Sequence, residues 1–516
     1  MKTFATFFFI CISLFTKGQI QKVLSKGEGA KLLMDSTGFY ICGNIETNTN
    51  DRCGLMRIDT NGNILWQKTY RDQIEFYSYA KDMVKNSDGS LTICGMTFND
   101  TISNEEIALY KVDSIGTKIW SRRIGHSLQD DEMLQIIHDT DGGYLIAGKA
   151  VNFNFRQNDF YLIKTDSLGH IVYEKTYGSS GDESCTTLLR AGNRLLLAGD
   201  IKDSLSNEYN MAILTIDETG NLLSSVQFPL SGFQSIQAIA IDRDRNLIIA
   251  AQCNNAATSN EDNSLIVKLD SIGNTLWSRY IAGAKNFPYT LTTDTAQNII
   301  VGGNFRNSIT NINNFVAKIN PSGNLIDQKS YGNSFGEKIN SFITNNTGEN
   351  YFTGKYVRTD DLNPYITFNK IRFNDVLCTT NPVTLNLANE TISADTISFS
   401  TYSDTIEEIN SILTTSITNF TDSSLCSLSV GLESPENVEY FLSPIPAADQ
   451  IQIMSFDHKK IGLVNIFNCI GQKVRETPIE NDTFTLDVKS LSNGVYYLSI
   501  ENDRFRSIKK IIVAHF

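Results

Sequence analysis

Features that mark several other classes of protein are missing from this chain. No long stretch has apolar residues spaced three and four apart, as an amphipathic helix would, whereas turn-forming and β-branched residues are plentiful. No run of Lys and Arg is present, and 57 Asp+Glu against 44 Lys+Arg give a net charge of -13. The sequence therefore predicts an all-β protein and argues against nucleic acid as a partner.

The patterns of common catalytic and metal sites are missing as well. No G-x-S-x-G motif and no phosphate-binding loop occurs, and no two cysteines form a CxxC pair. The histidines share no spacing that would place two of them on one metal ion. They are His126, His138, His170, His458 and His515. We therefore predict no catalytic residue, no cofactor and no metal site.

The cysteines leave two interpretations open. Cys11 lies in an N-terminal apolar run, and eight cysteines follow it. Cys378 and Cys426 flank one low-complexity stretch and could form a disulfide in an oxidising compartment. Alternatively, all eight are buried free thiols.

The first 18 residues read as a signal peptide. Lys2 precedes the apolar run Phe4 to Phe15, which is too short for a stable membrane anchor. Small residues near Gly18 suit cleavage close to Gln19. No second apolar segment of spanning length follows, so the sequence predicts a secreted protein that is soluble after release. A length of 516 residues suggests two or three folding units.

A repeat of the form D-x-x-G-x-x-x-W recurs six times at steps of 50 to 54 residues. Its acid position, filled once by Asn, is Asp59, Asp113, Asp166, Asp217, Asp270 and Asn320. A glycine follows three residues later in every copy. The aromatic slot holds Trp66, Trp120, Tyr173, Ser224, Trp277 and Asp327. Each motif predicts a tight turn between two strands, with glycine supplying a positive φ.

A second series has seven members, spaced 51 to 53 residues apart. It ends at Gly43, Gly95, Gly148, Gly199, Ala251, Gly303 and Gly354. One period contains four short strands separated by turn signals, which is the content of one propeller blade. We therefore predict a seven-bladed β-propeller over residues 19–375. We also expect Ile20 to Leu24 to close the ring by pairing with the blade that contains Gly354 and Arg372.

Two further positions recur in the repeat. The residue before each series glycine is small, as at Cys42 and Cys94, because backbones approach closely where blades converge. Basic residues recur two positions before the turn acid, at Arg57, Lys111, Lys164, Lys268 and Lys318. Structural pairing across a hairpin or between blades is the preferred interpretation of these cations, and a basic binding ring is the alternative.

The repeat stops near residue 376. The Thr- and Ser-rich segment 376–434 is either a linker or a small β extension packed on the propeller. Residues 435–516 alternate polar and apolar positions around the turns Ile470-Gly471 and Asn493-Gly494, which predicts a small β-sandwich.

The sequence of this last segment resembles the C-terminal sorting domain of the bacterial type IX secretion system. YFLSPIPAADQIQI, VNIFNCIGQKV, TLDVKSLSNGVYYLSI and RSIKKIIVAHF follow the family's order, and Gly471, Gly494, Tyr496 and Lys510 fall at its characteristic positions. Pro444-Ile445-Pro446 replaces the family's PNP opening. The resemblance implies the type IX machinery as a partner, export through the periplasm and outer membrane, and release or attachment at the cell surface.

The repeats themselves resemble secreted β-propeller proteins of Bacteroidetes-like bacteria, through Asp141-Gly142-Gly143-Tyr144 and the D-x-x-G-x-x-x-W turns. That resemblance implies a fold and no particular activity. The same motif is similar to the tryptophan-docking repeat of quinoprotein propellers, but blade-to-blade packing explains the aromatic residue.

The sequence thus predicts a non-catalytic binding or scaffold module whose top-face loops bind an extracellular glycan, protein or peptide. The alternative is a secreted polysaccharide-degrading hydrolase or lyase, with acid pairs assembled from distant loops on the propeller face.

Overall fold

The structure is a computed structural model of the chain. It describes residues 20–373 apart from 48–49, 73–74, 100–103, 126–130, 153–156, 180, 203–207, 231, 255–261, 283–284, 309–310, 332–335 and 358–361, and the segments 386–389, 395–396, 400–402, 407–410, 413–417, 423–427, 440–443, 449–455, 463–468, 473–479, 481, 483–501 and 506–514. The predicted signal peptide, 1–18, lies outside them. The chain divides into two compact units, a larger one over Lys17–Leu428 and a smaller one over Ser429–Phe516.

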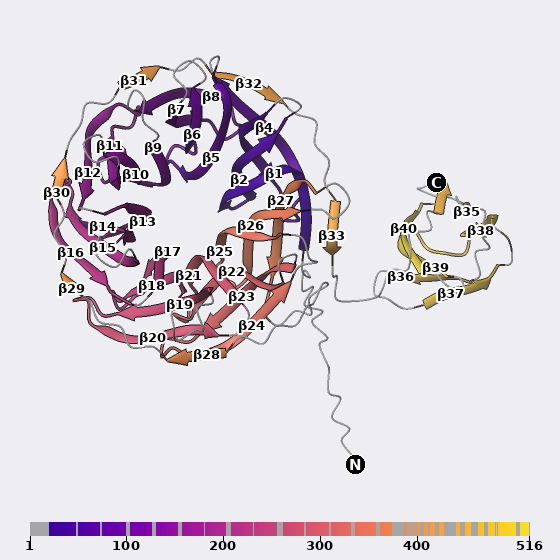
Figure 1. The fold of residues 1–516 in the computed structure, drawn as a ribbon. Coiled ribbons are helices and arrows are strands. Elements are labelled where there is room, and N and C mark those ends of the chain that lie inside the picture. The colour runs from indigo at the N-terminus through magenta and orange to yellow at the C-terminus, as the bar shows by residue number, and fades with distance from the viewer. Residues whose placement is uncertain are drawn as a thin grey trace, which may run out of the picture. The chain divides into compact units, whose positions relative to one another are not determined.

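The described part of the larger unit is a ring of seven four-stranded antiparallel blades, with the first strand of each blade innermost (Figure 1). Blades 2 to 4 comprise β5 (Glu75–Lys85), β6 (Leu91–Asn99), β7 (Asn104–Val112) and β8 (Lys118–Gly125); β9 (Asp131–His138), β10 (Tyr144–Asn152), β11 (Gln157–Thr165) and β12 (Ile171–Gly178); and β13 (Glu183–Ala191), β14 (Arg194–Lys202), β15 (Tyr209–Asp217) and β16 (Leu222–Phe228). Blades 5 and 6 comprise β17 (Phe233–Ile241), β18 (Leu247–Asn254), β19 (Asp262–Leu269) and β20 (Thr275–Ala282); and β21 (Lys285–Thr293), β22 (Ile299–Ser308), β23 (Asn311–Ile319) and β24 (Leu325–Tyr331). The predicted all-β propeller is confirmed.

Blades 7 and 1 share the 16-residue strand β1 (Ile20–Asp35). The other strands are β25 (Lys338–Thr344), β26 (Asn350–Val357) and β27 (Pro364–Ile371) in blade 7, and β2 (Gly38–Glu46), β3 (Asp51–Ile58) and β4 (Ile64–Asp72) in blade 1. Ile20 lies opposite Lys370 on β27, whereas the second half of β1 pairs with β2. The predicted closure is therefore confirmed, and it joins the first described strand to the last blade.

Most of the apolar core lies between neighbouring blades. Leu162 of blade 3 and Leu197 of blade 4, for example, belong to one buried cluster, and similar clusters join the other blades around the ring. Strands buried on both faces are therefore apolar over several consecutive residues.

The series glycines are required by a β-bulge in the first strand of every blade. The register shifts at one residue of each first strand, opposite the series position. A Cβ on any of the six glycines would lie 1.7 to 2.1 Å from a carbonyl oxygen of that strand, for instance 1.9 Å from the Glu132 carbonyl at Gly148. A bulge brings the two backbones into close approach, so only glycine fits without a shift of the strands.

The predicted packing role of the residues before the glycines is also confirmed. Cys42 and Cys94 are fully buried free thiols, and burial raises the pKa of both well above the ordinary value. Cys378 lies outside the described residues, so a disulfide with Cys426 and two free thiols both stay open as interpretations of this pair.

The D-x-x-G turns fasten one blade to the next. The aromatic residue of one motif packs against the turn glycine of the following blade, where a Cβ on Gly169 would lie 2.8 Å from the Trp120 ring. Trp66, Tyr173 and Trp277 meet Gly116, Gly220 and Gly323 in the same way. In blade 4 the slot holds Ser224, and a Cβ on Gly273 would meet nothing within 4 Å. The aromatic residues therefore serve blade packing, as predicted.

The recurrent cations form ion pairs within their own blades, which confirms the structural interpretation. Arg57 contacts Asp35 at 2.7 Å, and Lys268 contacts Asp242 at 2.9 Å. Each cation on a third strand reaches an acid in the turn between the first two strands. Lys111 pairs with Asp88, Lys164 with Asp139, and Lys318 with Asp294.

Six short strands from the Thr- and Ser-rich segment run along the rim of the ring, beyond the fourth strands (Figure 1). Each pairs antiparallel with an outer strand, and the blades are visited in the reverse of chain order. The pairs are β28 (Asn386–Asn389) on β20, β29 (Asp395–Thr396) on β16, β30 (Ser400–Tyr402) on β12, β31 (Glu407–Asn410) on β8, β32 (Leu413–Ile417) on β4, and β33 (Ser423–Ser427) on β1. We call these six strands the belt. It covers strand edges that would otherwise expose backbone donors and acceptors.

The smaller unit contains two antiparallel sheets. One consists of β34 (Tyr440–Ser443), β35 (Gln450–Ser455) and β38 (Thr483–Asp487), and the other of β37 (Lys473–Pro478), β36 (Leu463–Asn468), β39 (Gly494–Glu501) and β40 (Arg506–Val513). Ile451 and Ile453 of the first sheet share a buried cluster with Val464 and Leu498 of the second. The small β-sandwich is therefore confirmed.

No helix in the described segments is both long and apolar enough to span a bilayer.

The belt should hold the closing strand in place, because Ile20 to Val23 pair with β27 on one edge and with β33 on the other. Replacing each residue of 423–427 with proline removes the backbone N–H donors of β33 and with them part of this pairing. We expect hydrogen exchange at Ile20 to Val23 to accelerate about tenfold or more, since each lost hydrogen bond contributes roughly 0.5–1.5 kcal/mol. The same replacement at 430–434 is the control, and equal exchange rates in both variants would contradict the role of β33.

Candidate functional site

The described residues contain no cluster of three or more His, Cys, Asp or Glu side chains that could hold a metal ion. His170 contacts Asp166 at 3.0 Å within its own turn, and the Nε2 atom of His138 lies 3.1 Å from the Lys85 carbonyl oxygen. His126, His458 and His515 lie outside the described residues. The segments 100–103, 153–156, 203–207 and 255–261, which connect second and third strands, also lie outside them.

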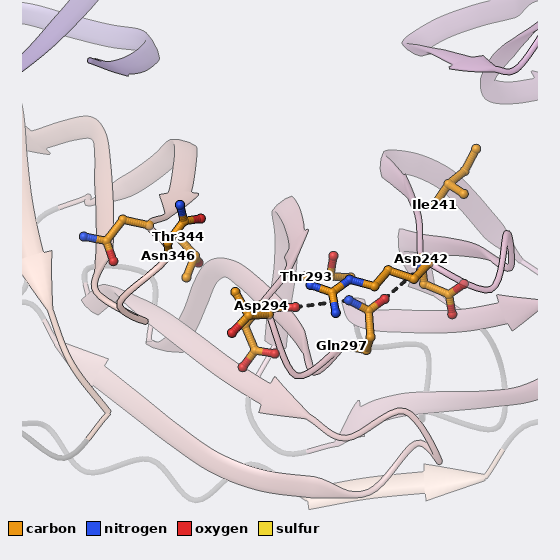
Figure 2. A pocket seen from close by; sticks show the side chains of 10 residues that line it. Ile241, Asp242, Thr293, Asp294, Gln297, Thr344 and Asn346 are labelled. Carbon is orange, nitrogen blue, oxygen red and sulfur yellow. Dashed lines mark hydrogen bonds between the residues drawn. The ribbon is translucent and has the colours of Figure 1, made fainter. Parts of the chain in front are cut away.

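A pocket of about 270 Å³ lies where the first-to-second-strand turns of blades 5, 6 and 7 meet (Figure 2). Its lining comes from the end of a first strand and the following turn in each blade. These residues are Ile241, Asp242 and Arg243; Thr293, Asp294, Thr295 and Gln297; and Thr344, Asn345 and Asn346. Nearly all of them carry hydrogen-bonding side chains. No single motif in the sequence indicates this pocket.

Two of the three turns hold a non-glycine residue in the left-handed region. Arg245 has φ 64 and Gln297 has φ 63, whereas the corresponding turns of blades 2, 3 and 7 use Gly89, Gly142 and Gly348. Such backbone costs of the order of 1 kcal/mol or more and persists where the surroundings determine it. Strained positions of this kind cluster at ligand sites, so their occurrence beside this pocket favours a functional role.

The side chain of Gln297 links these turns. Its Oε1 atom accepts a hydrogen bond from the Arg243 backbone N–H at 2.8 Å, and its Nε2 atom donates to the Asp294 carbonyl at 3.3 Å (Figure 2). Glycine at this position could not make either contact. The bridge therefore fixes the spacing between the turns of blades 5 and 6.

The two carboxylates of the pocket are locked in ion pairs. Asp242 lies 2.9 Å from the Lys268 Nζ atom, and Asp294 lies 2.8 Å from the Lys318 Nζ atom. Burial alone would raise their pKa values, but hydrogen bonds from these lysines and from neighbouring Asn side chains outweigh burial and hold both pKa values below the ordinary one. Both groups are therefore ionised at neutral pH, and neither has a proton to donate.

A second pair of carboxyl groups is closed to any substrate. Asp159 on β11 and Glu183 on β13 are both about 1% exposed, at the junction of blades 3 and 4. Burial raises the pKa of Glu183 to about 8, and the negative charge of Asp159 also raises it. Hydrogen bonds from Ser179 act in the opposite direction and lower the pKa. At the corresponding place in blade 2, Arg123 contacts Glu106 at 3.0 Å. Blade 3 has Thr176 in place of that arginine.

The folded state therefore holds a proton on Glu183 at a pH where the unfolded chain, with its ordinary value of 4.5, has lost it. Stability from this group is fully present below pH 4.5 and declines as the pH rises from there through 8. Glu183→Gln should flatten this decline and raise the free energy of unfolding at pH 9 by about 3 kcal/mol. Denaturant titrations at pH 5, 7 and 9 measure the effect, with Glu218→Gln as an exposed control. An unchanged dependence of the unfolding free energy on pH would contradict the raised pKa of Glu183.

Comparison with known proteins identifies the end of the chain. Residues 442–514 match the family described as the secretion system C-terminal sorting domain. Gly494 and Tyr496 lie on β39 and Lys510 on β40, while Gly471 lies outside the described residues. No curated protein matches the chain.

Several solved structures align with part of this chain at low similarity. Sqt1 from Chaetomium thermophilum aligns with 66% of this chain and 96% of its own at 11% identity and a TM-score of 0.38. Puromycin hydrolase aligns with 69% and 55% at 12% identity and a TM-score of 0.41. PorZ, a surface component of the type IX secretion system of Porphyromonas gingivalis, aligns with 96% and 100% at 9% identity and a TM-score of 0.19. These scores are low, so the fold rests on the strand pairing itself.

Proposed function

We propose that this chain, which its C-terminal sorting domain directs through the type IX secretion system to the cell surface or the medium, is a non-catalytic binding module. The observation that carries this proposal is the pocket of blades 5 to 7, whose carboxylates are tied up in ion pairs. A glycosidase needs one carboxyl group that keeps a proton at working pH. Asp242 and Asp294 do not meet that requirement.

The lining supports a ligand rich in hydroxyl groups. Arg243 and Asn346 are exposed on their turns, and Thr293 and Thr295 add hydroxyls on the strand and turn between them. Planar amide and guanidinium groups beside hydroxyls suit the paired donors and acceptors of a sugar. The volume is small for a ligand pocket, so it fits a terminal unit of a glycan better than a folded protein.

Binding can be tested by screening the exported protein on a glycan array and measuring the best ligand by calorimetry. Arg243→Ala combined with Asn346→Ala should weaken binding about tenfold or more, because each lost hydrogen bond to a charged group contributes roughly 1.5–3 kcal/mol. Asn193→Ala, on the equivalent turn of blade 4, should leave the affinity unchanged. Release of reducing sugars from a polysaccharide, or equal affinity in all three proteins, would overturn the proposal.

The export step has its own test. Deleting 435–516 removes the β-sandwich that matches the sorting family, so the remaining protein should accumulate in the periplasm. Cell fractionation and immunoblotting of full-length and truncated protein measure this. Unchanged export of the truncated protein would refute the assignment of this domain.

A further inference from the structure

The first strands carry a second set of polar side chains at the end opposite to the pocket. In each blade the bulged residue is partly exposed, and the residue directly before it is buried. The residue two positions before the bulged one is partly exposed in all blades except blade 5, where Ser235 is buried. The bulged residues are Ala30, Lys81, Leu134, Thr186, Gln237, Tyr289 and Asn340. The residues two positions before them are Glu28, Tyr79, Glu132, Ser184, Ser235, Phe287 and Lys338. We call these positions the mouth.

The mouth positions vary where structural positions of the same repeat do not. The bulged residue is a different type in each of the seven blades, whereas the series position opposite is glycine in six of seven. A position that served only the bulge would be filled alike in all blades. The variation therefore shows that blade geometry does not dictate the residue type at these positions, so their side chains are free to differ in chemistry from blade to blade.

Charged residues gather on one side of the mouth, over blades 7, 1, 2 and 3. Glu28 lies 3.8 Å from Lys338 and 3.5 Å from Lys355 on β26, and the Asn340 Nδ2 atom donates to it at 2.7 Å. Glu132 lies 3.3 Å from Lys81 and 3.0 Å from Lys149 on β10. Each glutamate is therefore shared by two lysines, and every one of these side chains is between 28% and 35% exposed.

Four lysines thus pair with two glutamates, and Glu105 on β7 accepts hydrogen bonds from the hydroxyl groups of Tyr77 and Tyr79 on blade 2. Burial lowers the pKa of Lys338, and the charges of Lys355 and Lys81 lower it further against the attraction of Glu28. Lysines of blades 7 and 2 therefore act on one another electrostatically across the mouth. Asp200 of blade 4 interacts electrostatically with Lys149 and accepts a hydrogen bond from Ser235 at 2.6 Å, while burial raises the pKa of this carboxyl to about 6.

Aromatic rings lie beneath two of these lysines. The Lys81 Nζ atom is 5.1 Å from the centre of the Tyr79 ring, and the Lys338 Nζ atom is 4.8 Å from the centre of the Tyr289 ring. Tyr77 stacks on both Tyr79 and Phe98, which extends the aromatic surface on blade 2. Rings beside ammonium groups offer an apolar face and an anion partner within one surface.

We infer that the mouth binds an acidic glycan, with lysines of blades 7, 2 and 3 contacting its anionic groups and Tyr79 and Tyr289 contacting its sugar rings. Ser184, Thr186 and Gln237 line the uncharged side and suit the hydroxyl groups of the same chain. In the free protein, Glu28 and Glu132 position the lysines through ion pairs. Binding of an anionic ligand replaces part of these ion pairs. This site is separate from the pocket and does not depend on it.

The test uses the full-length exported protein and three polymers: polygalacturonate, dextran sulfate and neutral dextran. Calorimetry should show binding of an acidic polymer that weakens as salt increases, because exposed charges are screened, and no binding of neutral dextran. Preference for polygalacturonate identifies carboxylates as the ligand groups, and preference for dextran sulfate identifies sulfate esters.

Variants at the mouth separate binding from folding. Lys81→Gln combined with Lys338→Gln should weaken binding at least tenfold, whereas Glu28→Gln combined with Glu132→Gln should strengthen it, because the competing carboxylates are removed. Lys329→Gln, on the outer strand β24, is the matched control and should bind like the natural protein. A folding defect could not produce the gain in affinity. Failure to bind either acidic polymer, or equal affinity in both double variants, would overturn the site.

Discussion

The pairing of β1 with two blades is the constraint on which the rest of the structure depends. Its first half completes blade 7 and its second half begins blade 1, so one strand removes both free edges of the ring. At the junction, a Cβ on Gly27 would lie 2.1 Å from the Asn44 carbonyl oxygen, and its φ is +135. The belt then returns to the same strand, since β33 pairs with Ile20 to Val23. The strand that closes the ring at the beginning of the domain is therefore also the strand that the belt covers.

Within the ring, the repeated residues act in pairs, and blade 4 has lost the third-strand cation together with its acid. Blade 4 has Thr215 in place of the third-strand cation, and its turn Ala191-Gly192-Asn193 lacks the acid that the cation would meet. Likewise Ser224 replaces an aromatic residue, and the glycine of the next turn has an open space beside it. A buried charge without its partner is costly, whereas losing both is nearly neutral. The departures from the repeat therefore follow the same rules as the repeat itself.

The two ends of the inner strands have different chemistry. At the turn end, acids are neutralised by third-strand lysines and the pocket uses amides, hydroxyls and Arg243. At the mouth, four lysines pair with two glutamates, and two of these lysines lie over tyrosine rings. Among the described residues, the pKa values of Asp242 and Asp294 in the pocket lie below the ordinary one, and the pair of Glu183 and Asp159 is buried.

The sequence by itself determined the number of blades, the closing strand, the structural role of the recurrent cations and the sorting domain, because each of these depends on residues at fixed spacing within one repeat or segment. The acids that pair with the cations were identified only by the structure. Only the tertiary structure decided the path of the belt, since pairing along an open strand edge uses backbone groups that all residues share. The pocket and the mouth could not be predicted either. Arg243 and Asn346, or Lys81 and Lys338, come from different blades, and only the curvature of the closed ring brings them to one place.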